Sequence, residues 1–309
     1  MSNKIQHINI AVTNRCNLTC KQCSIWQENP KEDLSLKNIE SVLRSPALDE
    51  NASIALTGGE PFLHSDLINI VGSILEQKPS SLKIISTNGT LKNEMMSLFN
   101  KHGNLFSDFS LHISIDGITK HDEQRGSSLK TITNNIILIK EMFPEINIKL
   151  KFTITKINYT DIVSTYEYAK SHNLGFKIKL VENAKNYTNK FSDQNMINFT
   201  IKEKKLIAKD LLFVYNDLKR SNKKDAVFIH EVIKFLLEKN DPAFCRTPFN
   251  RIFIMPDGKV YSCIHFNCIG NIKDKSLEEI WHSKSAESIR SKIKEHGCKN
   301  CVAYHGFTL

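Results

Sequence analysis

Residues 5–23, IQHINIAVTNRCNLTCKQC, run from an alternating apolar segment directly into a loop with three cysteines. The alternation over residues 5–12 predicts a β-strand. The cysteines follow with the spacing Cys-x3-Cys-x2-Cys, and thiolates select zinc or iron–sulfur clusters. A four-iron cluster held only by Cys16, Cys20 and Cys23 keeps one iron without a protein ligand, so a small molecule can bind there. The loop therefore predicts a centre for chemistry rather than for structure alone.

The composition indicates a protein of a reducing compartment. The 8 cysteines among 309 residues are grouped in short spacings, unlike a disulfide framework. No apolar run reaches the length of a membrane span, and residues 1–15 lack the apolar core of a signal peptide. We therefore expect a cytoplasmic protein without a membrane partner. The net charge of +9 comes from lysines spread along the chain, so nucleic acid is not an expected partner.

The first half of the chain alternates strand and helix patterns. Six strands joined by helices predict parallel pairing with right-handed crossovers. Six units are too few for a closed barrel of about 250 residues, so the predicted fold class is α/β, a partial (βα)6 barrel. The strands are expected at residues 5–12, 54–56, 82–87, 109–115, 147–155 and 175–181, and the helices at 35–45, 66–77, 91–102, 129–142 and 160–172.

Glycine-rich and polar signals follow the predicted strands at their carboxyl ends, where α/β folds bind ligands. After the cysteine loop come Gly58-Gly59-Glu60-Pro61, then Asn88-Gly89, and then Asp116. The repeated placement favours one site at this edge.

The second half divides into two further parts. We expect the barrel to cover residues 1–185, a helical bridge residues 186–240 and a small α+β module residues 241–309. The bridge holds helices at 197–220 and 226–239, after a polar loop at 183–195. This loop and the C-terminal tail are expected to contact substrate. In the last part, residues 251–263 predict a hairpin that turns at Pro256-Asp257-Gly258, followed by helices near 276–281 and 285–295.

The cysteine loop together with Gly58-Gly59-Glu60-Pro61 resembles the radical S-adenosylmethionine superfamily over about two thirds of the chain. The resemblance implies that the amine and carboxylate of S-adenosylmethionine bind the open iron. It also implies that Gly58 and Gly59 let the backbone approach the cofactor, and that Glu60, followed by Pro61, accepts a hydrogen bond from the amine. Without the resemblance, a zinc or structural site and an ordinary turn remain as alternatives.

Residues 114–125 resemble a stretch in anaerobic sulfatase-maturating members of that superfamily. By this resemblance Ser114 binds a polar group of the cofactor, and Arg125 pairs with the methionyl carboxylate, which suits a planar guanidinium. The alternative for Arg125 is a surface charge beside Asp122 and Glu123. Asn88 either contacts the ribose or amine of the cofactor or simply forms a turn.

The later cysteines resemble the twitch module, the short relative of the SPASM domain in this superfamily. The resemblance implies that Cys245, Cys263, Cys298 and Cys301 enclose one auxiliary [4Fe–4S] cluster, so that the protein holds two such clusters. A four-cysteine zinc site is the alternative. Cys268 is left over: it is a packing thiol, a ligand in place of Cys263, or a hydrogen-atom donor as in some radical epimerases of the superfamily.

The resemblance also implies a reaction. A flavodoxin- or ferredoxin-type donor supplies an electron, S-adenosylmethionine is cleaved to a 5′-deoxyadenosyl radical, and this radical takes a hydrogen atom from the substrate. A fully ligated auxiliary cluster suits electron transfer, so we expect two-electron oxidation (dehydrogenation) of a small molecule, as in the 2-deoxy-scyllo-inosamine dehydrogenase type. The alternatives are peptide (RiPP) modification by crosslinking or by epimerisation with Cys268 as donor, and a non-catalytic iron–sulfur protein. A cysteine loop as early as residue 16 leaves no room for a fused leader-binding domain before it, which favours the small molecule.

Overall fold

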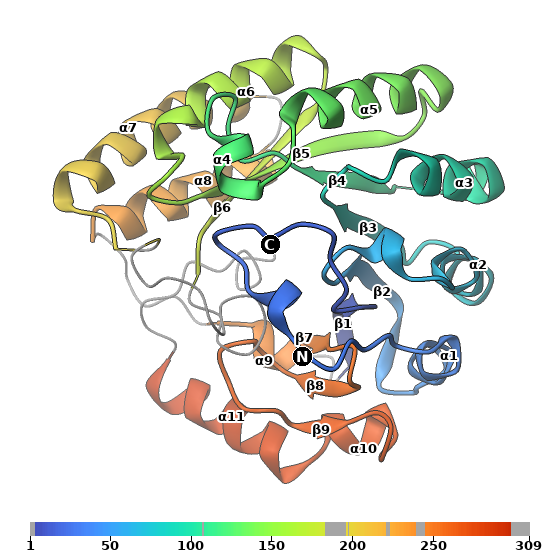
Figure 1. The fold of residues 1–309 in the computed structure, drawn as a ribbon. Coiled ribbons are helices and arrows are strands. Elements are labelled where there is room, and N and C mark those ends of the chain that lie inside the picture. Colours follow the sequence, from blue (N-terminus) through green and yellow to red (C-terminus); the bar gives the residue numbers. More distant parts are fainter. Residues whose placement is uncertain are drawn as a thin grey trace.

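The computed structural model describes residues 4–106, 108–182, 196, 198–220, 223–238 and 245–297. Its strands form one nine-stranded sheet in the order β6-β5-β4-β3-β2-β1-β7-β8-β9, curved into an open barrel (Figure 1). The first six strands pair in parallel, which confirms the predicted partial (βα)6 barrel. They are β1 (Ile5–Ala11), β2 (Leu48–Thr57), β3 (Leu82–Thr87), β4 (Ser110–Ser114), β5 (Asn147–Ile154) and β6 (Gly175–Leu180).

Helices cover the outer face of this sheet (Figure 1). The helices between strands are α1 (Leu36–Leu43), α2 (Leu67–Gln77), α3 (Lys92–His102), α5 (Leu129–Met142) and α6 (Ile162–Ser171). Alternate strand residues such as Ile8 and Ile10 are buried against them in the main core. Ser35 caps α1, because its hydroxyl accepts a hydrogen bond from the Asn38 amide. Among the described residues, short 3-10 turns lie at Ile25–Gln27, Pro61–Leu63, Gly103–Leu105 and Tyr159–Asp161.

One strand and one α-helix of the barrel differ from the sequence expectation. Strand β2 begins at Leu48 rather than near Ile54, because it pairs along β1 from Ile5 onward even where its own residues are polar. A short helix α4 (His121–Arg125) follows β4 in a stretch whose polar composition gives no helical periodicity. Both features depend on contacts with distant segments, which periodicity does not report.

Two further helices pack beside the last barrel strand. Helices α7 (Ile201–Leu218) and α8 (Lys223–Leu236) lie next to α6 and β6 (Figure 1). An ion pair between Lys177 of β6 and Asp225 of α8 links the second of them to the sheet. No helix in the described ranges is long and apolar enough to cross a membrane.

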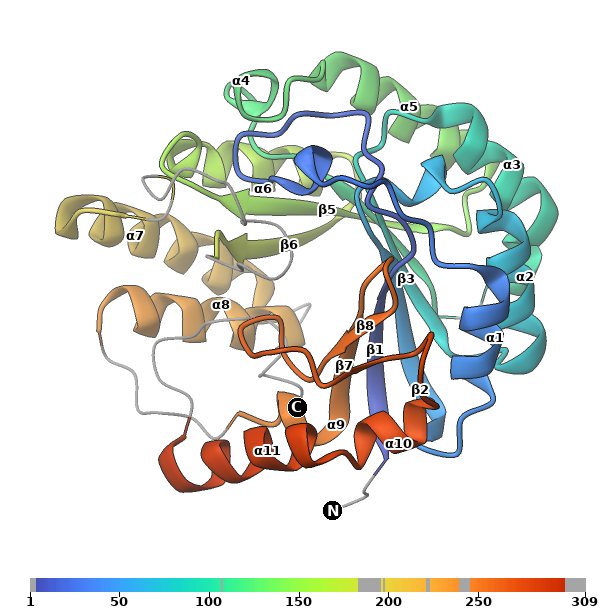
Figure 2. The same ribbon diagram turned by 60° about the horizontal axis from the view of Figure 1, so that its bottom comes forward.

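The last part of the described chain extends the sheet beyond β1. Strand β7 (Arg251–Ile254) runs parallel to β1, and β8 (Lys259–Tyr261) and β9 (Gly270–Asn271) continue in antiparallel fashion. This confirms the predicted hairpin. Its outer side carries α9 (Thr247–Asn250), α10 (Leu277–Trp281) and α11 (Lys284–His296) (Figure 2). The guanidinium of Arg290 stacks 4.0 Å from the buried Trp281 ring and donates to the Pro248 carbonyl, so it joins these three helices.

The hairpin also has its own apolar contact with the barrel. Ala11 of β1 packs with four residues of the hairpin region in a second core cluster, made of Ala11, Phe253, Met255, Tyr261 and Ile264. The predicted divisions near residues 185 and 240 fall beside residues outside the described ranges, and they stay predictions.

Candidate active site

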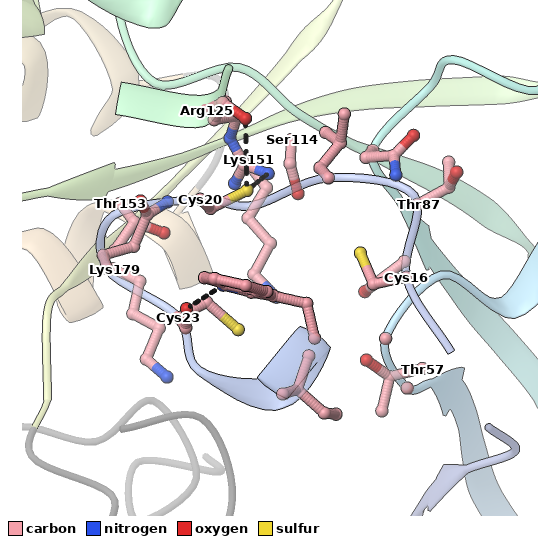
Figure 3. Close-up of a pocket in the computed structure, with 18 of the residues that line it drawn as sticks. Cys16, Cys20, Cys23, Thr57, Thr87, Ser114, Arg125, Lys151, Thr153 and Lys179 are labelled. Carbon is pink, nitrogen blue, oxygen red and sulfur yellow. Dashed lines mark hydrogen bonds between the residues drawn. The ribbon is translucent and has the colours of Figure 1, made fainter. Parts of the chain in front are cut away.

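A pocket opens at the carboxyl edge of the barrel strands, between the cysteine loop and the inner face of the sheet (Figure 3). It brings together eight residues predicted from the sequence, namely Cys16, Cys20, Cys23, Gly58, Gly59, Asn88, Ser114 and Arg125. Glu60, Pro61, Cys245, Cys263 and Cys268 do not line it. The roles assigned to all of these residues stay predictions, and Cys298 and Cys301 lie outside the described residues.

The second half of the cysteine loop is held by one backbone and one side-chain hydrogen bond. The Lys21 amide donates to the Gln124 carbonyl over 2.9 Å, and the indole of Trp26 donates to the Cys23 carbonyl over 2.9 Å. Burial raises the pKa of Cys16 to about 11 and that of Cys23 to about 12, because a buried thiolate lacks solvation. A bound cationic metal centre would stabilise the thiolates and so lower these pKa values.

The arrangement of the thiols bears on the kind of centre. Within the described ranges, no three or more His, Cys, Asp or Glu side chains gather around a single metal-ion position. The three loop cysteines instead line a wider pocket (Figure 3). Three thiols on one pocket suit a four-iron cluster with one open iron, whereas a structural zinc site takes four protein ligands.

The two glycines after β2 are needed for contact with the stem of the cysteine loop. The Gly59 and Glu60 amides donate to the carbonyls of Thr13 and Arg15, both over 2.7 Å. A Cβ at Gly58 would lie 2.4 Å from the Thr13 oxygen, and one at Gly59 would lie 2.1 Å from the Arg15 oxygen. The close approach is thus between two backbone segments, and it fixes the cysteine loop to the end of β2.

Glu60 does not line the pocket itself but binds two residues that do. It is fully buried, and its carboxylate accepts hydrogen bonds from the Phe62 amide, the Thr87 hydroxyl and the Asn88 amide over 3.2, 2.7 and 2.7 Å. Burial raises the pKa of Glu60 to about 7, against the opposing effect of these donors. In this structure Glu60 ties the turn after β2 to the end of β3. The buried Pro61 starts the 3-10 turn that follows.

Asn88 makes contacts on both of its amide atoms. Its Nδ2 donates to the Asn17 side chain of the cysteine loop over 2.8 Å, and its Oδ1 accepts from the Thr90 amide over 2.9 Å. The turn-forming role is therefore present in the structure. The cofactor contact stays a prediction beside it.

Asp116 is the polar centre of the site, and sequence reasoning assigned it no role. It is fully buried, and Oδ2 accepts from Arg125 Nε over 2.6 Å and from Gln22 Nε2 over 2.7 Å. Its Oδ1 accepts from the Thr153 amide over 2.7 Å. One carboxylate therefore connects α4, the cysteine loop and β5. The available signal was its position directly after the fourth predicted strand.

Arg125 is buried, so the alternative of a surface charge is wrong. Only 10% of its side chain is exposed. While Nε pairs with Asp116, Nη1 lies 3.9 Å from Cys20 Sγ, at the pocket wall (Figure 3). Asp116 thus fixes the orientation of the guanidinium beside the thiols. It binds only Nε, so the terminal nitrogens of the guanidinium are not used by this contact.

We expect Arg125→Ala to weaken S-adenosylmethionine binding by about 1.5–3 kcal/mol, the range for hydrogen bonds to charged groups. Equilibrium binding to the reconstituted protein would measure this, with iron content unchanged. Arg125→Ala leaves the Asp116 carboxylate without its ion-pair partner, which can destabilise the protein. The double variant Arg125→Ala/Asp116→Asn removes that charge, so a loss of affinity that persists in it is a loss of binding rather than of stability. Lys21→Ala is the control, because Lys21 is an exposed cation of the neighbouring cysteine loop. Equal affinity in Arg125→Ala and the natural protein would contradict the role.

The cysteines of the last part are placed only in part. Cys245 precedes α9 and Cys263 follows β8, and both are half-buried. Cys268 is exposed, and its thiol donates to the Gly270 carbonyl over 3.1 Å. Glu182 connects this region to the pocket wall. Its carboxylate lies 3.3 Å from His265 Nε2 and 3.4 Å from Lys179 Nζ.

Comparison with family models shows two matches. Residues 10–169 match the radical SAM superfamily, and residues 245–302 match SPASM, described as an iron–sulfur cluster-binding domain. GTP 3′,8-cyclase from Nautilia profundicola is 26% identical over 309 residues, covering 96% of this chain and 92% of that protein. The probable GTP 3′,8-cyclase of Sulfolobus acidocaldarius is 26% identical over 264 residues, covering 85% and 82%.

Solved structures show the same fold. Streptococcus suis SuiB bound to S-adenosylmethionine superposes with a TM-score of 0.69 at 17% identity, covering 94% of this chain and 68% of that one. Native anSMEcpe with bound AdoMet and the Cp18Cys peptide gives 0.67 at 19% identity, covering 91% and 81%. BtrN in complex with AdoMet and 2-DOIA gives 0.53 at 15% identity, covering 96% and 89%.

Proposed function

The chain belongs to the radical SAM superfamily, and from this premise we propose that it takes a hydrogen atom from a small polar molecule held in the barrel pocket. The cofactors of the two matched domains are S-adenosylmethionine and two [4Fe–4S] clusters. The observation that carries the proposal is the pocket itself. It joins three thiols and a fixed guanidinium to a wall of short polar and lysine side chains, an environment for a small polar ligand.

The cofactors, when bound, supply a carbon-centred radical that abstracts hydrogen and an auxiliary acceptor for one electron. The chain's own residues provide position. Asp116 holds Arg125 and Gln22 in fixed directions, and the glycine turn fastens the cysteine loop to β2. Such preorganisation lets the reacting atoms meet in one geometry and keeps stray hydrogen donors out.

We propose two-electron oxidation as the outcome, so the substrate loses one hydrogen atom to the radical, then one electron and one proton. A flavodoxin- or ferredoxin-type protein is the proposed electron donor. The exposed position of Cys268, outside the pocket lining, gives no support to the alternative of epimerisation with this thiol as donor.

A second candidate reaction has support from sequence similarity. The GTP 3′,8-cyclase of Nautilia profundicola is 26% identical to this chain over 96% of its length, which favours a radical rearrangement of a nucleotide as the competing outcome. Peptide modification has support from fold alone, since SuiB has been solved bound to its precursor peptide SuiA.

The proposal is tested by anaerobic incubation of the reconstituted, reduced protein with S-adenosylmethionine. We expect equal amounts of 5′-deoxyadenosine and methionine. A protein with both clusters that forms neither product would be a non-catalytic iron–sulfur protein, and the proposal would be wrong.

Once a substrate is in hand, solvent deuterium separates oxidation from epimerisation. We expect no deuterium at the reacting carbon, one S-adenosylmethionine consumed per product, and most activity retained in Cys268→Ala. Deuterium incorporation together with loss of turnover in that variant would replace oxidation by epimerisation.

A further inference from the structure

Four lysines lie on the inner face of two neighbouring strands. On β5 and β6, apolar residues alternate with them and are buried against the helices. Residues 151 and 177 are direct partners across the two strands, and residue 179 faces Thr153. Because side chains alternate along a strand, the lysines share one face. They are Lys149, Lys151, Lys177 and Lys179.

The two lysines nearest the carboxyl ends of β5 and β6, Lys151 and Lys179, line the candidate active site. Lys151 and Lys179 line the pocket with Ser114 and Arg125, on the side away from Cys16 and Thr57 (Figure 3). Each is only partly exposed. Partly buried lysines close to a buried arginine are repelled by it and by one another, so their presence requires compensating negative charge.

Lys177, Lys179 and Arg125 each have a carboxylate partner in the described part of the chain, and Lys151 does not. Lys177 pairs with Asp225, and Lys179 with Glu182 over 3.4 Å. Arg125 pairs with Asp116. Among the described residues, the Lys151 ammonium has no hydrogen-bond or ion-pair partner. Burial, with the charges of Lys179 and Arg125, lowers the pKa of Lys151 to about 8.

We propose that Lys151, assisted by Lys179, receives an anionic group of the substrate, a phosphate or a carboxylate. The inference rests on the proposed function and names its substrate class. A lysine ammonium is a compact charge that suits either anion. The bound anion would face the cysteine loop across the pocket, so the rest of the substrate would extend toward the reacting centre. The methionyl carboxylate is the other anion of the site, and it is assigned to Arg125.

Direct binding tests this without turnover. Pyrophosphate and tricarballylate are titrated calorimetrically into reconstituted protein that is saturated with S-adenosylmethionine. We expect one of the two to bind, pyrophosphate indicating a phosphate and tricarballylate a carboxylate. Lys151→Met should weaken that binding about tenfold or more, the loss expected for a contact between charged groups. Lys151→Arg should restore most of it.

Lys149→Met is the matched control. Lys149 lies on the same strand and face but does not line the pocket, so anion affinity should stay within about twofold. Iron content and melting temperature show that each variant is folded, and Lys151→Gln provides a second neutral variant.

Three results would overturn the inference: neither anion binds, Lys151→Met binds as the natural protein does, or Lys151→Met loses S-adenosylmethionine affinity instead. Formation of 5′-deoxyadenosine is measured in parallel. Cleavage of S-adenosylmethionine without anion binding would contradict the anion site alone, whereas anion binding without cleavage would contradict the proposed function alone.

Discussion

Replacement of Cys16, Cys20 and Cys23 together by alanine is expected to halve the bound iron, from roughly eight to roughly four per chain, and to abolish formation of 5′-deoxyadenosine. The physical reason is that the three thiols line one pocket, while the candidate ligands of the auxiliary cluster come from another part of the chain. Iron and sulfide analysis after anaerobic reconstitution, combined with product chromatography, measures both effects.

Cys268→Ala is the matched control for this experiment, because it removes an exposed thiol that lies outside the pocket lining. Its iron content should equal that of the natural protein. A fall in iron would place Cys268 among the auxiliary ligands instead of Cys263. A natural protein with about four irons and stoichiometric zinc would remove the auxiliary cluster from this account.

Asp116→Asn is expected to lower the free energy of unfolding by about 3–5 kcal/mol, the cost of leaving one partner of a buried ion pair uncompensated. Arg125 stays charged and almost fully buried. The NH2 group of the new asparagine cannot accept the hydrogen bonds that Asp116 Oδ2 now accepts. Because Arg125 loses its anchor, S-adenosylmethionine affinity should fall as well. Urea denaturation of the reconstituted protein and equilibrium binding measure the two effects.

Glu123→Gln is the control for Asp116→Asn. Glu123 lies on α4 two residues before Arg125, and its ion pairs with Lys21 and Lys120 are exposed. Exposed pairs contribute little to stability, so this variant should unfold almost as the natural protein does. An Asp116→Asn variant as stable as this control would show that Arg125 does not depend on the carboxylate.

The barrel could be predicted because its elements carry local periodicity. The third strand and the helix at 129–142 were predicted with the bounds that the structure shows. The polar first half of β2 and the docking of β7 on β1 could not be predicted, since both depend on pairing with distant residues.

The site was predictable at the level of motifs but not of individual contacts. Spacing located the cysteine loop and the glycine turn, whereas only the structure shows that Glu60 binds the end of β3 and that Asp116 anchors Arg125. The lysines of β5 and β6 were missed for a different reason. Alternating Lys and apolar residues normally indicate a strand with one face in water, and here that face is the barrel interior.

The position of β1 between β2 and β7 also concerns how the protein is made. Ile8 pairs with Ile54 on one side and with Ile252 on the other. During synthesis on the ribosome, the edge of β1 that pairs with β7 stays unpaired until residues 251–254 have emerged. Open strand edges are templates for association with other chains, and pairing between distant segments is slow. The half-built sheet is therefore the aggregation-prone stage of this protein, and the cysteine loop attached to β1 reaches its final surroundings only when that stage ends.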